Sequence, residues 1–344
     1  MVGAPRDPSG PQVGGLTALG DAVAAHVDGT PRVAVVVPTR ARETRLAFAL
    51  EALAAQTIGT GAFEVLLVRD GDVHGPRTPP PHRLRTRTLT MPARGTPAEK
   101  RNAGWRATAA PLVAFTDDDC RPHPGWLEAL VAAWESADGE PLVIQGAVKP
   151  DPDETHLLTG LARSLTVTAA DGWFQTANLA LTRPLLERLE GFDERFSRTG
   201  EDTDLGLRAV ATGAEVRFAE GALVWHAVHT LALPAAIRDR ARADQVAELI
   251  RRHPAQRDRL YRRVFWKRSH ALVALALAGM LARRPALAAL AALPYALANY
   301  DRSVPPSARH AAAVALHLPA RFAVDLAETV QTARGAVRSR TPLI

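Results

Sequence analysis

Three consecutive aspartates, Asp117, Asp118 and Asp119, end an apolar run that begins at Val113. Adjacent ionised carboxylates repel one another, and a hard cation such as Mg²⁺ or Mn²⁺ relieves this repulsion by coordinating their oxygens. Side chains alternate along an extended segment, so we expect Asp117 and Asp119 on one side and Asp118 on the other. The triplet therefore predicts a metal site, with a solvated acidic turn as the alternative.

A second group of acids begins 82 residues after Asp119, in the segment Gly200-Glu201-Asp202-Thr203-Asp204. The apolar spacing that follows predicts a helix that ends at Gly213. Carboxylates in a first helical turn are favoured by the helix dipole, so helix capping is one interpretation of these acids and chemistry is the other.

Single polar residues also follow predicted strands. Asp70 comes after an apolar run and before Gly71, where it is either a ligand-binding acid or a turn residue. His226 follows the last predicted strand, where a neutral imidazole could complete a metal site or fill a structural position, and His229 has the weaker claim. Cys120 is interpreted as a packing residue, because no partner base is evident.

These residues must be positioned by alternating strands and helices, which predict an α/β fold with a largely parallel sheet. A capping box at Thr96-Pro97-Ala98-Glu99 predicts the start of one helix. The other expected helices cover Glu43–Gln56, Trp126–Glu135, Arg183–Leu189 and Leu205 to Gly213. The expected strands are Arg32–Val37, Phe63–Val68, Leu84–Leu89, Leu112–Thr116, Pro141–Val148, Glu215–Phe218 and Ala222–Trp225.

Composition limits the possible partners. The 344 residues carry a net charge of +6, with the basic excess late in the chain, which predicts an anionic partner such as a phosphate-bearing substrate or an acidic membrane surface. Nothing resembles a module that reads nucleic acid. One cysteine excludes an intrachain disulfide and favours the cytoplasm. Residues 1–30 are expected to be a loose tail without the apolar core of a secretory signal.

Taken together, the motifs resemble the family 2 glycosyltransferases of the GT-A fold, a Rossmann-like fold, over roughly Pro31 to His229. The resemblance rests on an ordered set, namely Val36-Val37-Pro38-Thr39-Arg40, Asp70-Gly71, Arg101-Asn102-Ala103-Gly104, Asp117-Asp118-Asp119, Gly191-Phe192-Asp193 and Gly200-Glu201-Asp202-Thr203-Asp204. It implies an inverting enzyme that uses a nucleotide-diphosphate sugar and a divalent metal, Mg²⁺ or Mn²⁺.

The same resemblance implies roles for individual residues. Asp119 is the expected principal metal ligand, with Asp117 and His226 beside it, and Asp202 the expected general base, with Glu201 as the alternative. Nucleotide-sugar binding is expected from Pro38, Thr39, Arg40, Asp70, Arg101, Asn102, Asp117 and Asp118. Contacts to the sugar or acceptor are expected from Trp173, Gln175 and Asn178. Arg69 stands where the family often has a second acid, which leaves the nucleobase open.

The pattern becomes helical and rich in arginine after a domain boundary placed near Thr230, so 31–230 is expected to form the catalytic domain and 231–344 a helical region. Two apolar runs, Ala271–Ala282 and Ala286–Ala298, are each too short to span a bilayer. Read as one span, their two central arginines cost roughly 5 to 7 kcal/mol. We expect a helical hairpin at a membrane interface, with an ordinary helical subdomain as the alternative. Another helix is expected over Ala308–Val337.

The sequence therefore predicts transfer of a single sugar to an acceptor hydroxyl, carried by a lipid or by the cell envelope, at the inner face of the cell membrane. The Gln-x-x-Arg-Trp element of processive synthases is not visible. A metal-dependent nucleotidyltransferase or phosphohydrolase is the rival enzyme, although no Walker-type loop is present. A non-catalytic scaffold that binds nucleotide sugars is the third interpretation.

Overall fold

The computed structural model describes residues 29–73, 77–137, 141–158, 160–299 and 307–344, so nearly all of the tail expected at 1–30 lies outside the described residues. An eight-stranded mixed sheet with the order β3-β2-β1-β4-β7-β6-β8-β5 forms its centre. The strands are β1 Val33–Thr39, β2 Phe63–Arg69, β3 Thr86–Thr90, β4 Leu112–Phe115, β5 Cys120–Pro122, β6 Leu142–Pro150, β7 Leu179–Thr182 and β8 Glu215–His226.

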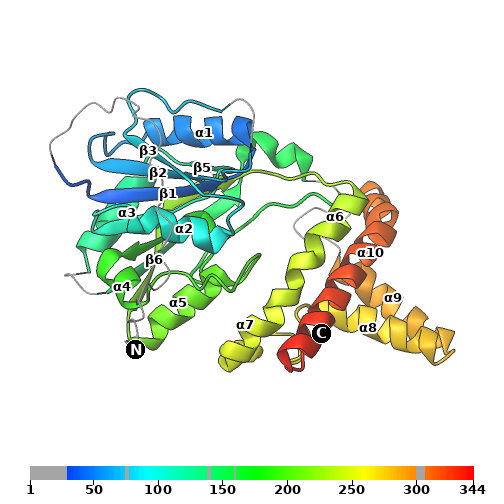
Figure 1. Cartoon of the computed structure of the whole chain (residues 1–344). Helices are drawn as coiled ribbons and strands as arrows, with labels where there is room; N and C mark the ends of the chain where they lie inside the picture. The colour runs from blue at the N-terminus through cyan, green and yellow to red at the C-terminus, as the bar shows by residue number, and fades with distance from the viewer. Residues whose placement is uncertain (1–28, 74–76, 138–140, 159, 300–306) are drawn as a thin grey trace, which may run out of the picture.

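Five helices cover the two faces of this sheet. They are α1 Glu43–Ala54, α2 Pro97–Arg106, α3 Trp126–Glu135, α4 Arg183–Arg188 and α5 Glu201–Ala211. One face packs against α1 and α3, and the opposite face packs against α2, α4 and α5 (Figure 1). Alternate residues of β1 face the two layers, which explains why the strand is apolar at consecutive positions.

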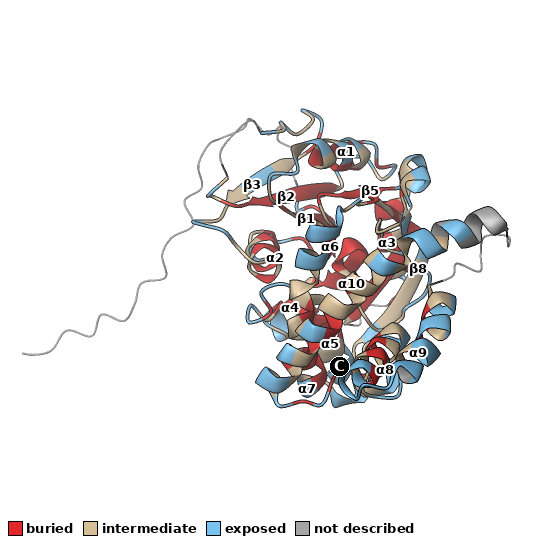
Figure 2. Ribbon diagram, turned by 90° about the vertical axis from the view of Figure 1, so that its right-hand side faces the viewer, coloured by how far each residue is buried: buried red, intermediate tan, exposed pale blue. Residues whose placement is uncertain are grey.

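Parallel pairing dominates the first half of the sheet, as expected. Strand β1 lies between β2 and β4, and β3 pairs with β2, all in parallel. Strand β7 is antiparallel to both β4 and β6, and β5 is antiparallel to β8, so the sheet is mixed beyond β4. Strand β2 is buried while the edge strand β3 is largely solvent-accessible (Figure 2).

Several predicted elements are confirmed, and some are corrected. The capping box of Thr96 and Glu99 is complete, and α3 has the predicted limits. The two short strands expected at Glu215–Phe218 and Ala222–Trp225 are one strand, β8, because a register shift opposite Gly146 and Ala147 lets pairing with β6 continue. The sequence pattern did not reveal β5 and β7, which are only three and four residues long.

The C-terminal third is helical, as expected, and gathers beside the sheet (Figure 1). Its elements are α6 Leu233–Asp239, the 3₁₀ helix η3 Arg240–Gln245, α7 Val246–Arg252, the 3₁₀ helix η4 Pro254–Arg259, α8 Arg268–Leu281, α9 Pro285–Ala298 and α10 Ala308–Ser339. Helices α8 and α9 form a hairpin, and α10 runs across α6, η3, α7 and α8. Among the described helices, none combines the length and apolar character that a membrane crossing needs.

Candidate active site

A cavity of about 360 Å³ opens where β1 and β4 end, at the carboxyl edge of the parallel strands. Four acids line it, namely Asp117, Asp119, Glu201 and Asp202. Seven basic side chains also line it, namely Arg40, Arg42, Lys100, Arg101, Arg163, Arg198 and Arg242. The excess of cations favours an anionic ligand such as a diphosphate.

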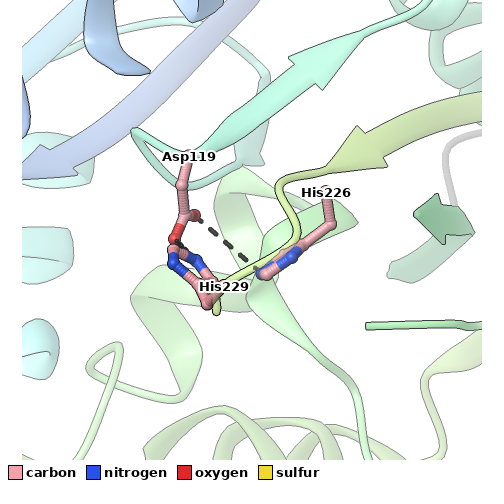
Figure 3. A group of neighbouring side chains, drawn as sticks. All are labelled: Asp119, His226 and His229. Atoms are coloured by element: carbon pink, nitrogen blue, oxygen red, sulfur yellow. Dashed lines mark hydrogen bonds and ion pairs between the residues drawn. The ribbon is translucent and has the colours of Figure 1, made fainter. Parts of the chain in front are cut away.

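Asp119 lies between two histidines from the end of β8 and the loop that follows (Figure 3). Its Oδ2 is 2.9 Å from His229 Nε2, and its Oδ1 is 3.9 Å from His226 Nε2. One ligand atom from each of the three residues lies within 4.8 Å of the others. The buried Oδ1 has no hydrogen-bond partner among the described residues, so one carboxylate oxygen remains available to a cation.

The charge of Asp119 is held by its neighbours. Burial opposes ionisation, but the hydrogen bond with His229 and the charge of Arg42 outweigh burial and hold the pKa of this carboxyl below its usual range. Arg42 also pairs with Asp118 at 2.6 Å. The guanidinium of Arg42 therefore partly neutralises two acids of the triplet.

The triplet divides as expected, although its backbone turns instead of remaining extended. The amide of Cys120 donates to the carbonyl of Asp117 at 3.1 Å. Asp117 and Asp119 line the cavity, whereas Asp118 is fully buried and accepts a hydrogen bond from Thr39 Oγ1 at 2.6 Å. Burial raises the pKa of Asp118 to about 6. Asp118 thus supports the end of β1 from behind.

The second acid group sits across the cavity at the start of α5. Gly200 precedes the helix with a φ of 97°, a left-handed conformation that glycine adopts without strain. Glu201 is buried and its Oε1 accepts from Arg101 Nη1 at 2.8 Å. The other nitrogen of Arg101 donates to Asp117 at 2.9 Å, so one buried guanidinium connects the two acid groups.

Asp202 has a different environment from Glu201. Its Oδ1 accepts from the amide of Thr203 at 2.8 Å, so a local role at the start of the helix is present. Removal from water and the neighbouring charge of Glu201 raise the pKa of Asp202 to about 7, against the opposing effect of Arg101. A carboxyl that titrates near neutrality is suited to proton transfer.

Asp70 lies behind the cavity wall. Its carboxylate contacts Lys100 Nζ at 2.9 Å and the amide of Gly95 at 3.0 Å, and Arg40 approaches to 3.5 Å. Pro38, Thr39 and Arg40 line the cavity, whereas Asp70 does not. The buried Oδ2 of Asp70 has no hydrogen-bond partner among the described residues.

Besides Asp70 and Asp118, three further residues expected at the ligand do not line this cavity. Asn102 binds the backbone of Phe192 through both its amide nitrogen and oxygen. Asn178 is fully buried and binds Trp126 Nε1 and two backbone carbonyls. Trp173 packs edge-on against Trp266 with ring centroids 5.1 Å apart. These three side chains stabilise the fold through contacts within the protein. Of the three expected sugar or acceptor contacts, only Gln175 lines the cavity.

Several cavity residues were not expected from the sequence. Arg42 follows Ala41, whose positive φ of 52° turns the chain after β1, and the recurrence of arginine after Thr39 was the available signal. Arg163, Arg198 and Arg242 come from distant segments and carry no local motif. His229, which had the weaker claim, makes the shorter contact with Asp119.

Comparisons with known proteins identify the family of this chain. The model described as Glycosyl transferase family 2 matches residues 34–181, and the model described as Glycosyl transferase family group 2 matches residues 112–317. A validoxylamine A glucosyltransferase of Streptomyces hygroscopicus subsp. limoneus is 28% identical over 240 residues, which cover 59% of this chain and 53% of that protein. A pre-mycofactocin glycosyltransferase of Mycobacterium tuberculosis (strain ATCC 25618 / H37Rv) is 27% identical over 270 residues, which cover 74% of this chain and 51% of that protein.

The chain thus spans about half the length of the curated relatives it matches. Among solved structures, the mannosyltransferase of Pyrobaculum calidifontis in complex with GDP-Man and Mn²⁺ shares the fold, with a TM-score of 0.52 and 20% identity over 91% of this chain and 88% of that one. The second family model alone covers more than half of the sequence, from the last strand before the acidic triplet into α10. This chain belongs to the family 2 glycosyltransferases.

Proposed function

We propose that this chain is an inverting glycosyltransferase that transfers one sugar from a nucleotide-diphosphate sugar to an acceptor hydroxyl. One observation carries the proposal, namely two carboxylates in different electrostatic states in a cavity rich in basic side chains. On one wall the ionised carboxylate of Asp119 lies beside two histidines. On another wall lies Asp202, whose pKa is raised to about 7. A carboxylate that stays ionised can stabilise positive charge, and a carboxyl that titrates near neutral pH can transfer a proton, so the two together suit glycosyl transfer.

The basic lining supports a diphosphate ligand. Lys100 and Arg101 rise from the first half of α2, and Arg40 extends from the end of β1. Their positive charges favour the two phosphates, and we assign the adjoining end of β1, with Pro38 and Thr39, to the nucleoside. Asp70 orients Arg40 and Lys100 from behind and remains our candidate for contact with the nucleobase.

The donor set fits a divalent cation, Mg²⁺ or Mn²⁺. Asp119, His226 and His229 would hold it, with Asp117 beside them. Two imidazoles with one carboxylate favour Mn²⁺ over Mg²⁺, because Mg²⁺ prefers an all-oxygen shell. When bound, the ion would neutralise the charge that develops on the leaving diphosphate. The Mn²⁺ and GDP-Man of the Pyrobaculum calidifontis mannosyltransferase support this assignment.

Asp202 is our candidate for the general base. Glu201 accepts a hydrogen bond from Arg101 and serves as its structural partner, whereas the carboxyl of Asp202, with its pKa raised to about 7, exchanges its proton near neutral pH. A carboxylate that accepts the proton of the acceptor hydroxyl makes that oxygen a better nucleophile at the anomeric carbon. Attack from the face opposite the diphosphate gives inversion.

The C-terminal hairpin supports an acceptor at a membrane surface. Met280, Leu281, Leu290 and Leu293 are all more than half exposed on α8 and α9. Arg283 and Arg284 lie exposed in the turn between the two helices. An exposed apolar surface with basic residues suits peripheral contact with acidic lipids, so we place a lipid-linked acceptor and the chain at the cytoplasmic side of the membrane.

The test is a panel of nucleotide sugars in the presence of Mn²⁺, with binding measured by calorimetry and turnover by release of the nucleoside diphosphate. The proposal requires that at least one donor binds in a metal-dependent manner and that turnover releases the nucleoside diphosphate and no sugar 1-phosphate. Release of a sugar 1-phosphate would favour the nucleotidyltransferase or phosphohydrolase, and binding without any turnover in the presence of membrane lipids would favour the scaffold. Absence of binding by every donor would refute the proposal.

A further inference from the structure

A second cavity, larger than the candidate active site, lies between the catalytic domain and the C-terminal helices. Its volume is about 730 Å³. Five basic side chains and one acid, Asp325, line it. The basic residues are Arg163, Arg240, Lys267, Arg268 and Arg321.

The charge in this cavity is only partly compensated. Arg163 pairs with Asp239 at 3.3 Å, and Lys267 pairs with Glu328 at 2.8 Å. Arg240 also approaches Glu328, at 3.8 Å. Within the described part of the chain, the side chains of Arg268 and Arg321 make no ion pair or hydrogen bond. The Nε atoms of Arg163 and Arg240 are buried and likewise lack an acceptor there. Unsatisfied guanidinium donors in a cavity favour an anion with several acceptor oxygens, such as a phosphate group.

This cavity adjoins the candidate active site through Arg163, which lines both. The backbone of Arg163 exchanges two hydrogen bonds with that of His229, at 3.0 and 2.8 Å. His229 in turn contacts Asp119. A ligand in the second cavity therefore lies next to the residues that we assign to the metal.

An apolar groove of about 370 Å³ continues on the other side, between α8, α9 and α10. Leu272, Met280, Leu318 and Phe322 contribute to its lining. Tyr295 connects the two spaces, because its ring lines the groove and its hydroxyl donates to Asp325 of the basic cavity at 2.9 Å. The basic cavity and the apolar groove thus adjoin at the contact between Tyr295 and Asp325, and we refer to the two together as the amphipathic site.

We infer that this site binds the acceptor as a lipid phosphodiester, with the phosphate group in the basic cavity, the hydrocarbon chain on one side of it in the apolar groove, and the hydroxyl-bearing group esterified on its other side. The inference rests on the proposed glycosyl transfer and names its acceptor class. The apolar surface of the α8–α9 hairpin, with Leu290 and Leu293 exposed, lets a chain enter from a membrane. The opposite end of the acceptor, which carries the hydroxyl, points past Arg163 into the active site.

Isothermal titration with dodecyl phosphate below its micelle concentration tests the site, with inorganic phosphate and dodecyl maltoside as comparison ligands. We expect dodecyl phosphate to bind at least about ten-fold more tightly than either, because both the chain and the charge contribute. Saturation with a nucleoside diphosphate and Mn²⁺ should not displace it. Equal affinity for all three ligands, or displacement by the nucleotide, would overturn the inference.

Variants locate the two parts of the ligand. Arg268→Ala with Arg321→Ala should weaken dodecyl phosphate by about ten-fold or more. Arg283→Ala with Arg284→Ala, which removes two exposed arginines outside the cavity, should not. Ala292→Trp should obstruct the groove and weaken dodecyl phosphate while inorganic phosphate binds as before, and Leu293→Trp, on the exposed side of the same helix, is its control. Unchanged binding in both cavity variants would overturn the inference.

Nucleotide binding separates this inference from the proposed function. If the wild-type protein binds a nucleoside diphosphate with Mn²⁺ but shows no preference for dodecyl phosphate, only the lipid phosphate site fails. If the wild-type protein binds no nucleoside diphosphate, the proposed glycosyl transfer is refuted together with the acceptor site that rests on it. Thermal unfolding of each variant, compared with the wild-type protein, confirms that a loss of binding is not a loss of fold.

Discussion

Asp119 and Asp202 are the same kind of residue in one cavity, and the fold gives them opposite states. Asp119 is buried among cations, and the hydrogen bond with His229 and the charge of Arg42 hold its pKa below the usual range despite burial. Asp202 is partly buried, and burial together with the negative charge of Glu201 raises its pKa to about 7. The difference shows that partners, more than burial, decide whether a carboxyl holds a charge or exchanges a proton.

The largest effect should come from removing the exchangeable proton site. Asp202→Asn keeps the shape of the side chain and its contact with Thr203 but cannot accept a proton, so kcat should fall by about 10² to 10⁴. The affinity for the nucleoside diphosphate should stay within roughly two-fold. Steady-state kinetics and calorimetry on the same preparation measure both. Unimpaired transfer by this variant would remove Asp202 from the reaction.

The next effect concerns the opposite wall. His226→Ala and His229→Ala should each weaken Mn²⁺ by about 10- to 100-fold, with His229 the more sensitive because it lies 2.9 Å from Asp119. Mg²⁺, which prefers oxygen ligands, should be affected less. His123→Ala serves as the control, since this exposed histidine lies outside the cavity. Equal Mn²⁺ affinity in all three variants would show that imidazole is not a ligand.

The pH dependence of kcat/KM should follow the raised pKa of Asp202. The base is protonated below about pH 7, so the rate should fall towards ten-fold per pH unit on the acid side of that value. Glu201→Gln removes a neighbouring negative charge and should move the midpoint to lower pH. A midpoint near pH 4 in the wild-type protein would contradict the environment described for Asp202.

Stability should respond in the direction set by the same shift. The folded-state pKa of Asp202 lies above its unfolded value near 3.8, so its contribution to stability is present at low pH and is lost as the pH rises through about 7. Asp202→Asn should therefore gain stability over the wild-type protein between pH 6 and 8, by on the order of 1 kcal/mol. Chemical denaturation at the two pH values checks this, and a gain that shrinks over that interval would oppose it.

The smallest effect on activity should come from Asn178, because its side chain is buried and makes hydrogen bonds within the fold. Asn178 is fully buried and satisfies Trp126 and the carbonyls of Ala147 and Ala222, so Asn178→Ala should destabilise the fold by about 2 to 4 kcal/mol. Below the unfolding transition KM for the donor should be nearly unchanged. A rise in KM for the donor without a loss of stability would indicate that Asn178 contacts the sugar.

Much of the sheet and of its flanking helices could be predicted because the signals are local. Apolar runs such as Phe63–Val68 and the capping box at Thr96 depend on neighbouring residues only, and the structure confirms both. The short strands β5 and β7 could not be found in this way, since pairing with partners distant in sequence defines them. For the same reason, the local pattern divides β8 into two segments, Glu215–Phe218 and Ala222–Trp225, because only the pairing with β6 shows that the strand is continuous.

The candidate site shows the same limit. Acids that follow strands were visible in the sequence, and the structure brings Asp117, Asp119, Glu201 and Asp202 to one cavity. Arg242 reaches that cavity only because η3, after β8, folds back beside the sheet, and Arg163 reaches it from the segment between β6 and β7 by pairing with His229. No local pattern reveals either arrangement. Conversely, Asn102 lies within a recognisable motif, but its side chain makes hydrogen bonds with the backbone of Phe192 and does not line the cavity.

The division between the two aspartates is tested most directly by nucleoside diphosphate binding to Asp119→Asn and Asp202→Asn, each measured with and without Mn²⁺. We predict that Mn²⁺ strengthens binding to the wild-type protein and to Asp202→Asn alike, and that this enhancement disappears in Asp119→Asn, because only Asp119 stands beside His226 and His229. Enhancement that survives in Asp119→Asn, or that is lost equally in Asp202→Asn, would contradict the account.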